Sequence, residues 1–282
     1  MTSPWSALGT EADLPCWAKE LIESNTEPHT QSSEIQHRCI TVPNAALLSA
    51  ERFTHDVRRA YTEILDGLEL DSIFRIWNFI PRIGQHDGCE LNRYMRFNTA
   101  RLHAFQTHSG NRGYPPASGV GHAGDDLVIH LLSGADSVDA VGNVRQIPPR
   151  EYSSTWGPLP PVFARGALVN CPDHFYGLIL SGTASVRGEC TVHPTDIEKQ
   201  IHETFTNINT VLDAAHMQPR KLDSLLVYVT HDTDVDAVMA HLSEVDFAHD
   251  SEIEVRVGPL CRPDLLVEIE GFTRLPLRTP MT

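Results

Sequence analysis

The sequence has few basic residues and no segment rich in lysine or arginine. Its 282 residues carry 22 basic and 37 acidic side chains, a formal charge of −15. This excess of negative charge would repel a nucleic-acid backbone. No apolar run is long enough to span a bilayer, and the first residues lack the charged start and apolar core of a signal peptide. We therefore expect a cytoplasmic protein that binds neither nucleic acid nor membrane.

Sequence patterns for metal sites and disulfides are missing as well. The six cysteines are scattered without a CxxC pair, which is typical of reduced thiols. Fifteen histidines occur, but there is no HExxH and no Cys/His cluster with ligand spacing. We therefore predict no metal site. With 41% hydrophobic residues the chain can bury a full core without such cross-links.

The first half of the chain predicts an arm followed by alternating helices and strands. Residues 1–45 are polar and rich in turn-forming residues, so we expect an irregular arm with little packed structure before Ile40. The spacing of apolar residues beyond it predicts, in order, a helix from Ser49 to about Gly67, a strand with one buried face over 74–80, a helix over 90–106 and a buried strand over 126–132.

A Pro-rich passage over residues 147–162 is the predicted domain junction. The pattern after it predicts strands over 167–170 and 176–181, a helix that begins with a capping box of Thr195 and Glu198, a strand over 225–229, a helix over 235–242, and strands over 253–257 and 265–269. Such alternation predicts an α+β fold, in which helices pack on one face of mixed β-sheets. The predicted division is an arm (1–45), an N-terminal α+β domain (46–158) and a C-terminal domain (159–282).

Two acidic residues stand in an apolar strand near the end of the chain. With a period of two, Glu268 and Glu270 face the same side, opposite Val267 and Ile269. Burial near a dry pocket disfavours the charged form of a carboxyl, so its pKa rises and it can donate a proton at neutral pH. The alternative is a solvent-facing acidic stripe on an edge strand, and the strand pattern alone slightly favours that alternative.

Other candidate binding residues lie in and after the Pro-rich passage. Arg165, among apolar neighbours, could clamp a substrate carboxylate, because a guanidinium matches that group with two hydrogen bonds. A structural salt bridge is the competing use. The small residues 181–185 at a strand end would let a ligand approach the backbone, or would only permit a tight turn. Arg93 and Arg96 form a basic helix face that is either solvated or available to an acidic ligand.

Five stretches resemble the chorismatase family, in the family's order: FRIWNFIP at 74–81, RYMRFNTAR at 93–101, YSSTWGPLPPVFARG at 152–166, LSGTAS at 180–185 and CRPDLLVEIEG at 261–271. Residues 161–271 are also similar to the smaller RidA/YjgF family, to which chorismatases are similar in fold. The resemblance implies a RidA/YjgF-like (chorismate mutase-like) C-terminal domain, with a related or smaller α+β domain before it.

The resemblance also implies roles for individual residues. Glu268 corresponds to the family's general acid. Cys261 corresponds to a position that resembles the members forming 3-hydroxybenzoate, whereas hydrolytic members tend to have alanine there. The residues that match the family's substrate pocket are Tyr152, Phe163, Arg165 and the turn from Gly182 to Ala184. Where the family usually has YPRQYGP this chain has YSSTWGP, so that Trp156 replaces a tyrosine in that loop and Ser154 an arginine.

The activity implied by the resemblance is cleavage of chorismate to pyruvate and 3-hydroxybenzoate, with Glu268 protonating the enolpyruvyl methylene. It requires no cofactor, and the expected partner is chorismate alone, bound by a monomer or a small homo-oligomer. Hydrolysis to a dihydroxycyclohexadiene carboxylate, 4-hydroxybenzoate formation, imine deamination and non-catalytic metabolite binding stay open. Against the deaminase, RidA-type enzymes carry an arginine at the start of the terminal strand, where this chain has Asp264, Leu265 and Leu266.

Overall fold

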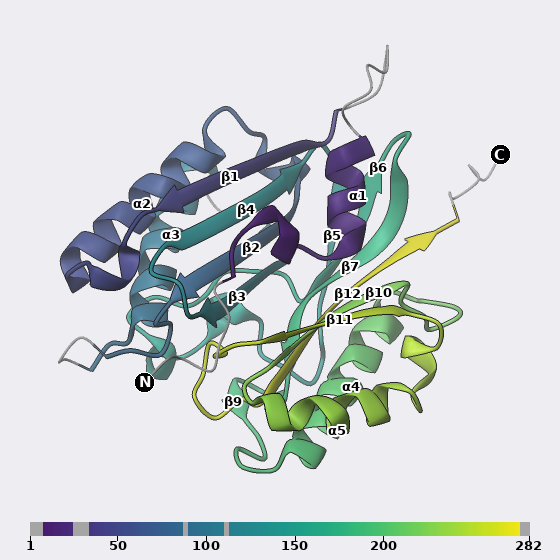
Figure 1. The fold of residues 1–282 in the computed structure, drawn as a ribbon. Helices are drawn as coiled ribbons and strands as arrows, with labels where there is room; N and C mark the ends of the chain where they lie inside the picture. Colours follow the sequence, from purple (N-terminus) through teal and green to yellow (C-terminus); the bar gives the residue numbers. More distant parts are fainter. Residues whose placement is uncertain (1–7, 25–33, 87–89, 110–112, 277–282) are drawn as a thin grey trace.

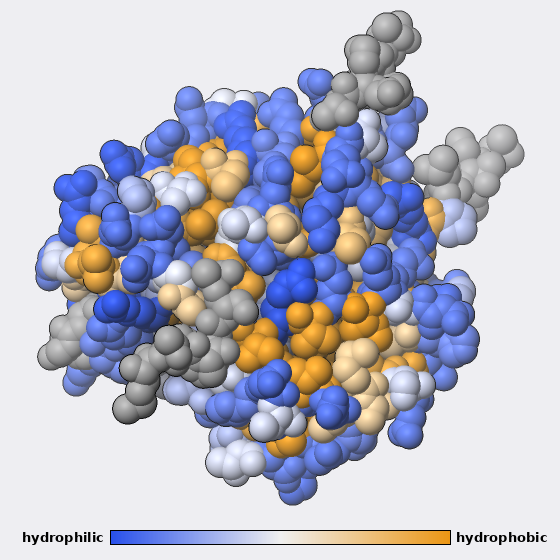
Figure 2. All heavy atoms as spheres, viewed as in Figure 1, coloured by the Kyte–Doolittle hydropathy of each residue, from blue (hydrophilic) through white to orange (hydrophobic). Residues whose placement is uncertain are grey.

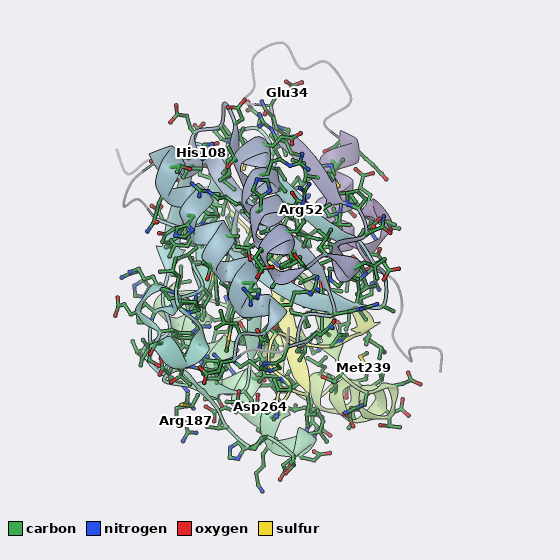
Figure 3. All side chains as sticks on the ribbon, turned by 90° about the vertical axis from the view of Figure 1, so that its left-hand side faces the viewer. Glu34, Arg52, His108, Arg187, Met239 and Asp264 are labelled. Carbon is green, nitrogen blue, oxygen red and sulfur yellow. The ribbon has the colours of Figure 1, made fainter. Side chains whose placement is uncertain are left out.

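The computed structural model describes residues 8–24, 34–86, 90–109 and 113–276, whose strands form two large sheets (Figure 1). The first sheet has the order β1-β4-β2-β3 and is mixed, because only β2 and β3 run parallel. Its strands are β1 (Gln36–Val42), β2 (Ile73–Pro81), β3 (Ala117–His122) and β4 (Leu127–Ser133). Helices α2 (Ala50–Leu65) and α3 (Arg93–Ser109) cover its outer face and lie side by side in Figure 3.

The second sheet has six strands in the order β11-β10-β12-β7-β6-β5. These are β5 (Ser137–Val141), β6 (Gly166–Cys171), β7 (Phe175–Ala184), β10 (Ser224–Val229), β11 (Glu252–Val257) and β12 (Val267–Leu275). Helices α4 (Ile197–Ala214) and α5 (Val235–Leu242) cover one face of this sheet (Figure 1). The fold is therefore α+β with mixed sheets and helices on one face of each, as the sequence predicts.

Smaller elements complete the described chain. They are helix α1 (Cys16–Ser24), the two-stranded ladder of β8 (Val186–Arg187) and β9 (Cys190–Thr191), and 3₁₀ turns at Glu11–Asp13, Ala45–Leu47, Leu70–Ser72, Pro149–Glu151, Ser154–Trp156, Asp232–Asp234 and Asp246–Ala248. None of the described helices is long and apolar enough to cross a membrane. Hydrophilic side chains cover most of the face in Figure 2, with apolar ones gathered near β11.

The two sheets share one hydrophobic core between their inner faces. Phe74 of β2 packs against Phe175 of β7 with ring centroids 5.8 Å apart, and Phe175 in turn contacts Phe272 of β12 at 5.4 Å. On the other side of each sheet a separate core contacts the helices. As a result β2 is buried along its whole length, and the prediction of a single buried face was wrong for this strand. Its two faces contact different layers.

The predicted N-terminal arm is packed where the structure describes it. Helix α1 begins at Cys16 and places Trp17 on the ring of Phe272, with centroids 4.4 Å apart and planes within 15°. Leu14 and Leu21 are buried with it in the core between the sheets. The expectation of little packed structure before Ile40 was therefore wrong for these residues. Their apolar side chains recur every three or four positions, a helical period that the polar surroundings concealed.

Two further details differ from the sequence analysis. Helix α4 is capped by Asp196, whose carboxylate accepts a hydrogen bond from the Lys199 amide at 3.1 Å, so the predicted capping box at Thr195 is one residue out. Strand β5, which precedes the Pro-rich passage, pairs with β6 of the second sheet. The division into domains at residue 158 stays a prediction, and it would separate these two paired strands.

Candidate active site

A pocket lies where the two sheets, helix α3 and the Pro-rich passage meet. Eight of the residues singled out from the sequence line it: Tyr152, Trp156, Phe163, Arg165, Gly182, Ala184, Cys261 and Glu268. The walls contributed by the first sheet and by α3 include Asn78, Ser118, Tyr94, Asn98 and Arg101, which sequence reasoning missed. In Figure 3 the segment before β12 is found at the labelled Asp264. The structure thus brings residues from distant parts of the chain to one cavity, while their roles stay predictions.

Glu268 stands near the start of β12, an interior strand of its sheet. It lies opposite Ala184 of β7 on one side and Tyr228 of β10 on the other, and only 5% of it is exposed. The alternative of an acidic stripe on an edge strand was therefore wrong. Gly182 of β7 lies directly against the Glu268 carboxyl, because a Cβ at this position would overlap it. A side chain larger than glycine at 182 would have to displace the acid.

The surroundings of Glu268 favour its protonated form. Burial raises the pKa of this carboxyl to about 8, and the negative charge of Glu270 acts in the same direction, against the opposing effect of Arg75 and two pocket arginines. Among the residues that the structure describes, none donates a hydrogen bond to the Glu268 carboxyl. An unpaired carboxyl whose surroundings favour the neutral form therefore lines the pocket.

Glu270 faces the same side of β12 but is firmly held. Its Oε2 forms an ion pair with Arg75 Nη2 at 2.7 Å and accepts a hydrogen bond from Trp77 Nε1 at 2.9 Å, both of which come from β2 of the other sheet. Arg75 Nη2 also donates to Ser118 Oγ at 2.7 Å, and the same hydroxyl oxygen accepts the Gly182 amide at 2.9 Å. The two carboxyls of one strand face therefore have different environments, one free and one fixed.

Arg165 comes just before β6 and projects into the pocket. Its Nη2 donates to the Tyr152 hydroxyl at 2.6 Å, and its guanidinium stands 5.2 Å from the Phe163 ring centroid. No ion pair joins Arg165 to any carboxylate in the described part of the chain, which leaves its charge uncompensated by contact. The competing use of this residue in a structural salt bridge is therefore not found there.

Arg262 is a second pocket arginine, which the sequence analysis did not single out although it stands in the CRPD motif. Its guanidinium lies 3.4 Å from the ring centroid of Trp156 and 5.6 Å from that of Tyr152. Its Nη1 donates to the backbone carbonyl of Glu189 at 2.8 Å. Stacking of this kind ties the Pro-rich passage to the segment before β12. Trp156 and Arg262 are 106 positions apart, and a contact between such distant segments gives no periodic signal in a sequence.

Cys261 is a neutral thiol in the pocket wall. Burial raises its pKa to about 12, with a further contribution from Glu268. Because the thiolate is the nucleophilic form, this environment argues against a covalent role for the sulfur. The side chain packs against the core between the sheets and against the core under α2 and α3. Its position therefore lets it shape the cavity next to the acid.

The pocket wall carries buried hydrogen-bond donors without acceptors. No described residue accepts a hydrogen bond from Asn98 Nδ2, from Nε or Nη2 of Arg101, from Trp156 Nε1 or from Arg165 Nε. Buried polar groups are normally satisfied, so unpaired donors on residues that line a pocket indicate a ligand that supplies acceptors. A wall of N–H groups with several positive charges suits an anionic ligand rich in oxygen acceptors.

The basic face predicted on α3 serves a different purpose. Arg93 is buried and donates to the backbone carbonyls of Ala45 and of Ala46, the latter at 3.3 Å, while its guanidinium stands over the Phe53 ring. Neither Arg93 nor Arg96 lines the pocket. The expected alternatives, a solvated face or a contact with an acidic ligand, were thus wrong for Arg93. Among the described residues, no group of three or more His, Cys, Asp or Glu could hold a metal ion.

The chain is similar to several known proteins. Residues 20–133 match the family model described as "Chorismatase FkbO/Hyg5-like, N-terminal". The chain is 33% identical over 237 residues to a 3-hydroxybenzoate synthase of Streptomyces hygroscopicus, which covers 78% of this chain and 69% of the relative. It is similar to the crystal structure of a chorismatase, with a TM-score of 0.74 and 25% identity over 86% of this chain and 76% of the other. The YjgF gene product of E. coli matches 49% of this chain, and 99% of its own, at 16% identity and a TM-score of 0.36.

Proposed function

Because this chain belongs to the chorismatase family and is an enzyme, we propose that it cleaves chorismate to pyruvate and 3-hydroxybenzoate. A relative named for this product, at 33% identity, supports the choice of product. Membership of a family of enzymes also sets aside the non-catalytic binding protein that the sequence alone left open. Hydrolysis of chorismate at the same site is the nearest competing reaction.

The observation that carries the proposal is the buried Glu268 carboxyl in the pocket wall, which pairs with no described residue and whose burial favours the protonated form. The methylene of an enolpyruvyl ether is its nucleophilic carbon, so the Glu268 proton adds there and leaves an oxocarbenium ion. The neighbouring C4 hydroxyl then attacks C3 as the C3–O ether bond breaks, which releases pyruvate and leaves a protonated oxygen bridging C3 and C4. The C4–O bond opens, so that this oxygen stays on C3 as the hydroxyl of 3-hydroxybenzoate. The ring becomes aromatic by losing the C3 proton, which the Glu268 carboxylate can take up. Chorismate contains the atoms of pyruvate plus hydroxybenzoate, so no net water is needed.

The remaining pocket residues support binding of this substrate. Chorismate is a dicarboxylate, and the open N–H groups of Arg101, Arg165, Asn98 and Trp156 offer donors to its carboxylate oxygens. Phe163 and Trp156 give the cavity apolar faces for the ring. Arg165, fixed by Tyr152 yet without a carboxylate partner, is the expected clamp for one of the two acid groups.

The test is incubation of the purified protein with chorismate, followed by quantification of pyruvate and of every aromatic product. Glu268→Gln should fold normally and lose nearly all turnover, because an amide cannot donate the required proton. Glu254→Gln is the matched control, since Glu254 is a carboxylate of the same sheet that pairs with Arg256 at 2.9 Å, away from the pocket. A folded Glu268→Gln enzyme with a substantial part of the wild-type rate would rule out this acid.

A further inference from the structure

Glu270 has no part in the proposed proton transfer, yet it is buried beside the acid. Its side chain is 5% exposed and that of its partner Arg75 is 1% exposed. Taking both charges out of water is costly, and a buried ion pair is often no more stabilising than well-packed apolar residues would be. A contribution to stability therefore does not by itself explain why this buried ion pair is present. Its location next to Glu268 suggests a role in the function of that residue.

The pair belongs to a chain of contacts that closes around Glu268. Arg75 reaches from β2 across the core, where its Nη2 forms the ion pair with Glu270 and donates a hydrogen bond to Ser118 Oγ. Ser118 in turn accepts the amide of Gly182, the residue that lies against the Glu268 carboxyl. Glu268 therefore has two neighbours in this set: Glu270, two positions further along β12, and Gly182, which lies against its carboxyl. Arg75 connects these two neighbours, because it contacts Glu270 directly and Gly182 through Ser118.

We propose that Glu270 and Arg75 form a positioning pair, which keeps the Glu268 carboxyl protonated and directed into the pocket. The proposal rests on the assigned role of Glu268 as the general acid. Neither member of the pair needs to touch the substrate. Both act through Glu268, by charge and by holding the residue that packs against it.

Among the groups around Glu268, Glu270 is the one whose negative charge disfavours ionisation of the Glu268 carboxyl. The other titratable or charged groups that face this carboxyl are Arg75 of β2, Tyr94 of α3, Arg165 before β6, Tyr228 of β10, and Cys261 and Arg262 before β12. Burial raises the pKa of both tyrosines and of the thiol, so these three are neutral at ordinary pH. The three arginines favour an ionised Glu268. The negative charge of Glu270 acts against the three arginines and raises the pKa of Glu268.

Arg75 and Trp77 distinguish the two carboxyls by contact. The ion pair with Arg75 and the hydrogen bond from Trp77 both act on Glu270 Oε2, whereas no described residue pairs with the Glu268 carboxyl. These contacts stabilise a negative charge at Glu270 and leave the proton for Glu268.

The experiment compares wild type with Glu270→Gln over a range of pH. In the pH profile of kcat, the midpoint of the decrease at high pH should move to lower pH by about 1 unit or more, because the negative charge of Glu270 no longer disfavours ionisation of Glu268. Below the new midpoint kcat should approach the wild-type value. A merely structural role would instead lower kcat by one factor at every pH, and an unchanged midpoint in a folded variant overturns the proposal. Glu254→Gln should leave the midpoint in place.

Infrared spectroscopy provides a readout that does not depend on turnover. The carbonyl stretch of protonated Glu268 is identified as the band that Glu268→Gln lacks. As pH rises, this band should disappear at a lower pH in Glu270→Gln than in the wild type. In Glu270→Gln/Arg75→Met both charges are removed, and the midpoint should return toward the wild-type value. This double variant also removes the unpaired buried cation, in case Glu270→Gln alone fails to fold. Should Glu268→Gln retain turnover, the general-acid assignment would fail, while the infrared midpoint would still decide whether Glu270 sets the protonation of Glu268.

Discussion

Cys261 stands seven residues before Glu268 and shares the pocket with it. If the thiol fills space that water would otherwise occupy, Cys261→Ala should keep releasing pyruvate, because the proton donor is untouched. The product ratio should shift from 3-hydroxybenzoate toward the dihydroxycyclohexadiene acid, which forms when water is admitted. Chromatography of both products after complete turnover measures this ratio.

Cys171→Ala is the control for that experiment. Cys171 is also buried, in the core between the sheets, but it does not line the pocket. Loss of one buried sulfur costs on the order of 1 kcal/mol in either variant. A steering role requires that only the Cys261 variant changes the ratio. Equal product ratios in the two variants would leave Cys261 as a packing residue and weaken the preference for 3-hydroxybenzoate.

The protonation of Glu268 also has a consequence for stability. Its pKa is raised from 4.5 to about 8 in the folded state, so between these values the folded chain holds a proton that the unfolded chain has lost. The free energy of unfolding from this group therefore falls as pH rises through that window, and is level above it. Glu268→Gln lacks this dependence. Urea unfolding of both proteins at about pH 5 and about pH 8 measures this. The free energy of unfolding of the variant, relative to that of the wild type, should be higher at about pH 8 than at about pH 5. A constant difference would mean that Glu268 is already ionised.

The pocket residues differ in how far they could be predicted. The alternation of β12 places Glu268 and Glu270 on one face, and the family motifs point to Arg165 and Cys261. The separate surroundings of the two carboxyls could not be predicted, because Arg75 reaches Glu270 from 195 positions earlier in the chain. Arg101 and Arg262 were missed for the same reason: their contacts depend on how distant segments pack.

At the scale of elements, local sequence patterns predicted most helices and strands, but not which strands pair with one another in a sheet. The apolar stripe of α4, with Ile201, Phe205 and Ile208 buried, follows from spacing alone. That β12 lies between β7 and β10 does not, since strand pairing joins segments far apart in sequence. The Pro-rich passage was expected to be a junction. Its turns bring Tyr152 and Trp156 to the pocket wall, and Arg165 follows just after it.

The start of α4 allows a test of the corrected cap. Asp196 accepts the Lys199 amide at 3.1 Å and pairs with the Lys199 ammonium at 2.7 Å, whereas Thr195 is exposed. Asp196→Ala should lower the free energy of unfolding by about 1 kcal/mol, the usual effect of losing an N-cap. Thr195→Ala should change it by less than about 0.5 kcal/mol. Denaturant titrations of both variants measure this, and a larger loss at Thr195 would restore the capping box predicted from the sequence.

At the scale of the molecule, the pocket depends on both sheets being in place. The acid comes from β12 of the second sheet, and several open donors come from α3, which covers the first. Helix α1 reinforces the contact, since Trp17 stacks on Phe272 and lies 5.7 Å from Trp77 of β2. A division into domains at residue 158 would therefore pass through a shared core and a shared site.

This shared core predicts that the described chain unfolds in one cooperative transition. Phe74 of β2 and Phe175 of β7 are both buried and their rings are in contact, so removal of either ring weakens both sheets. Phe74→Ala and Phe175→Ala should each lower the free energy of unfolding by about 3 to 5 kcal/mol. In each variant the loss of secondary structure by circular dichroism should coincide with the change in tryptophan fluorescence, because Trp17 and Trp77 report on the same core. Two separate transitions, each shifted by only one of the variants, would instead support two domains that fold independently, with a site that assembles only after they dock.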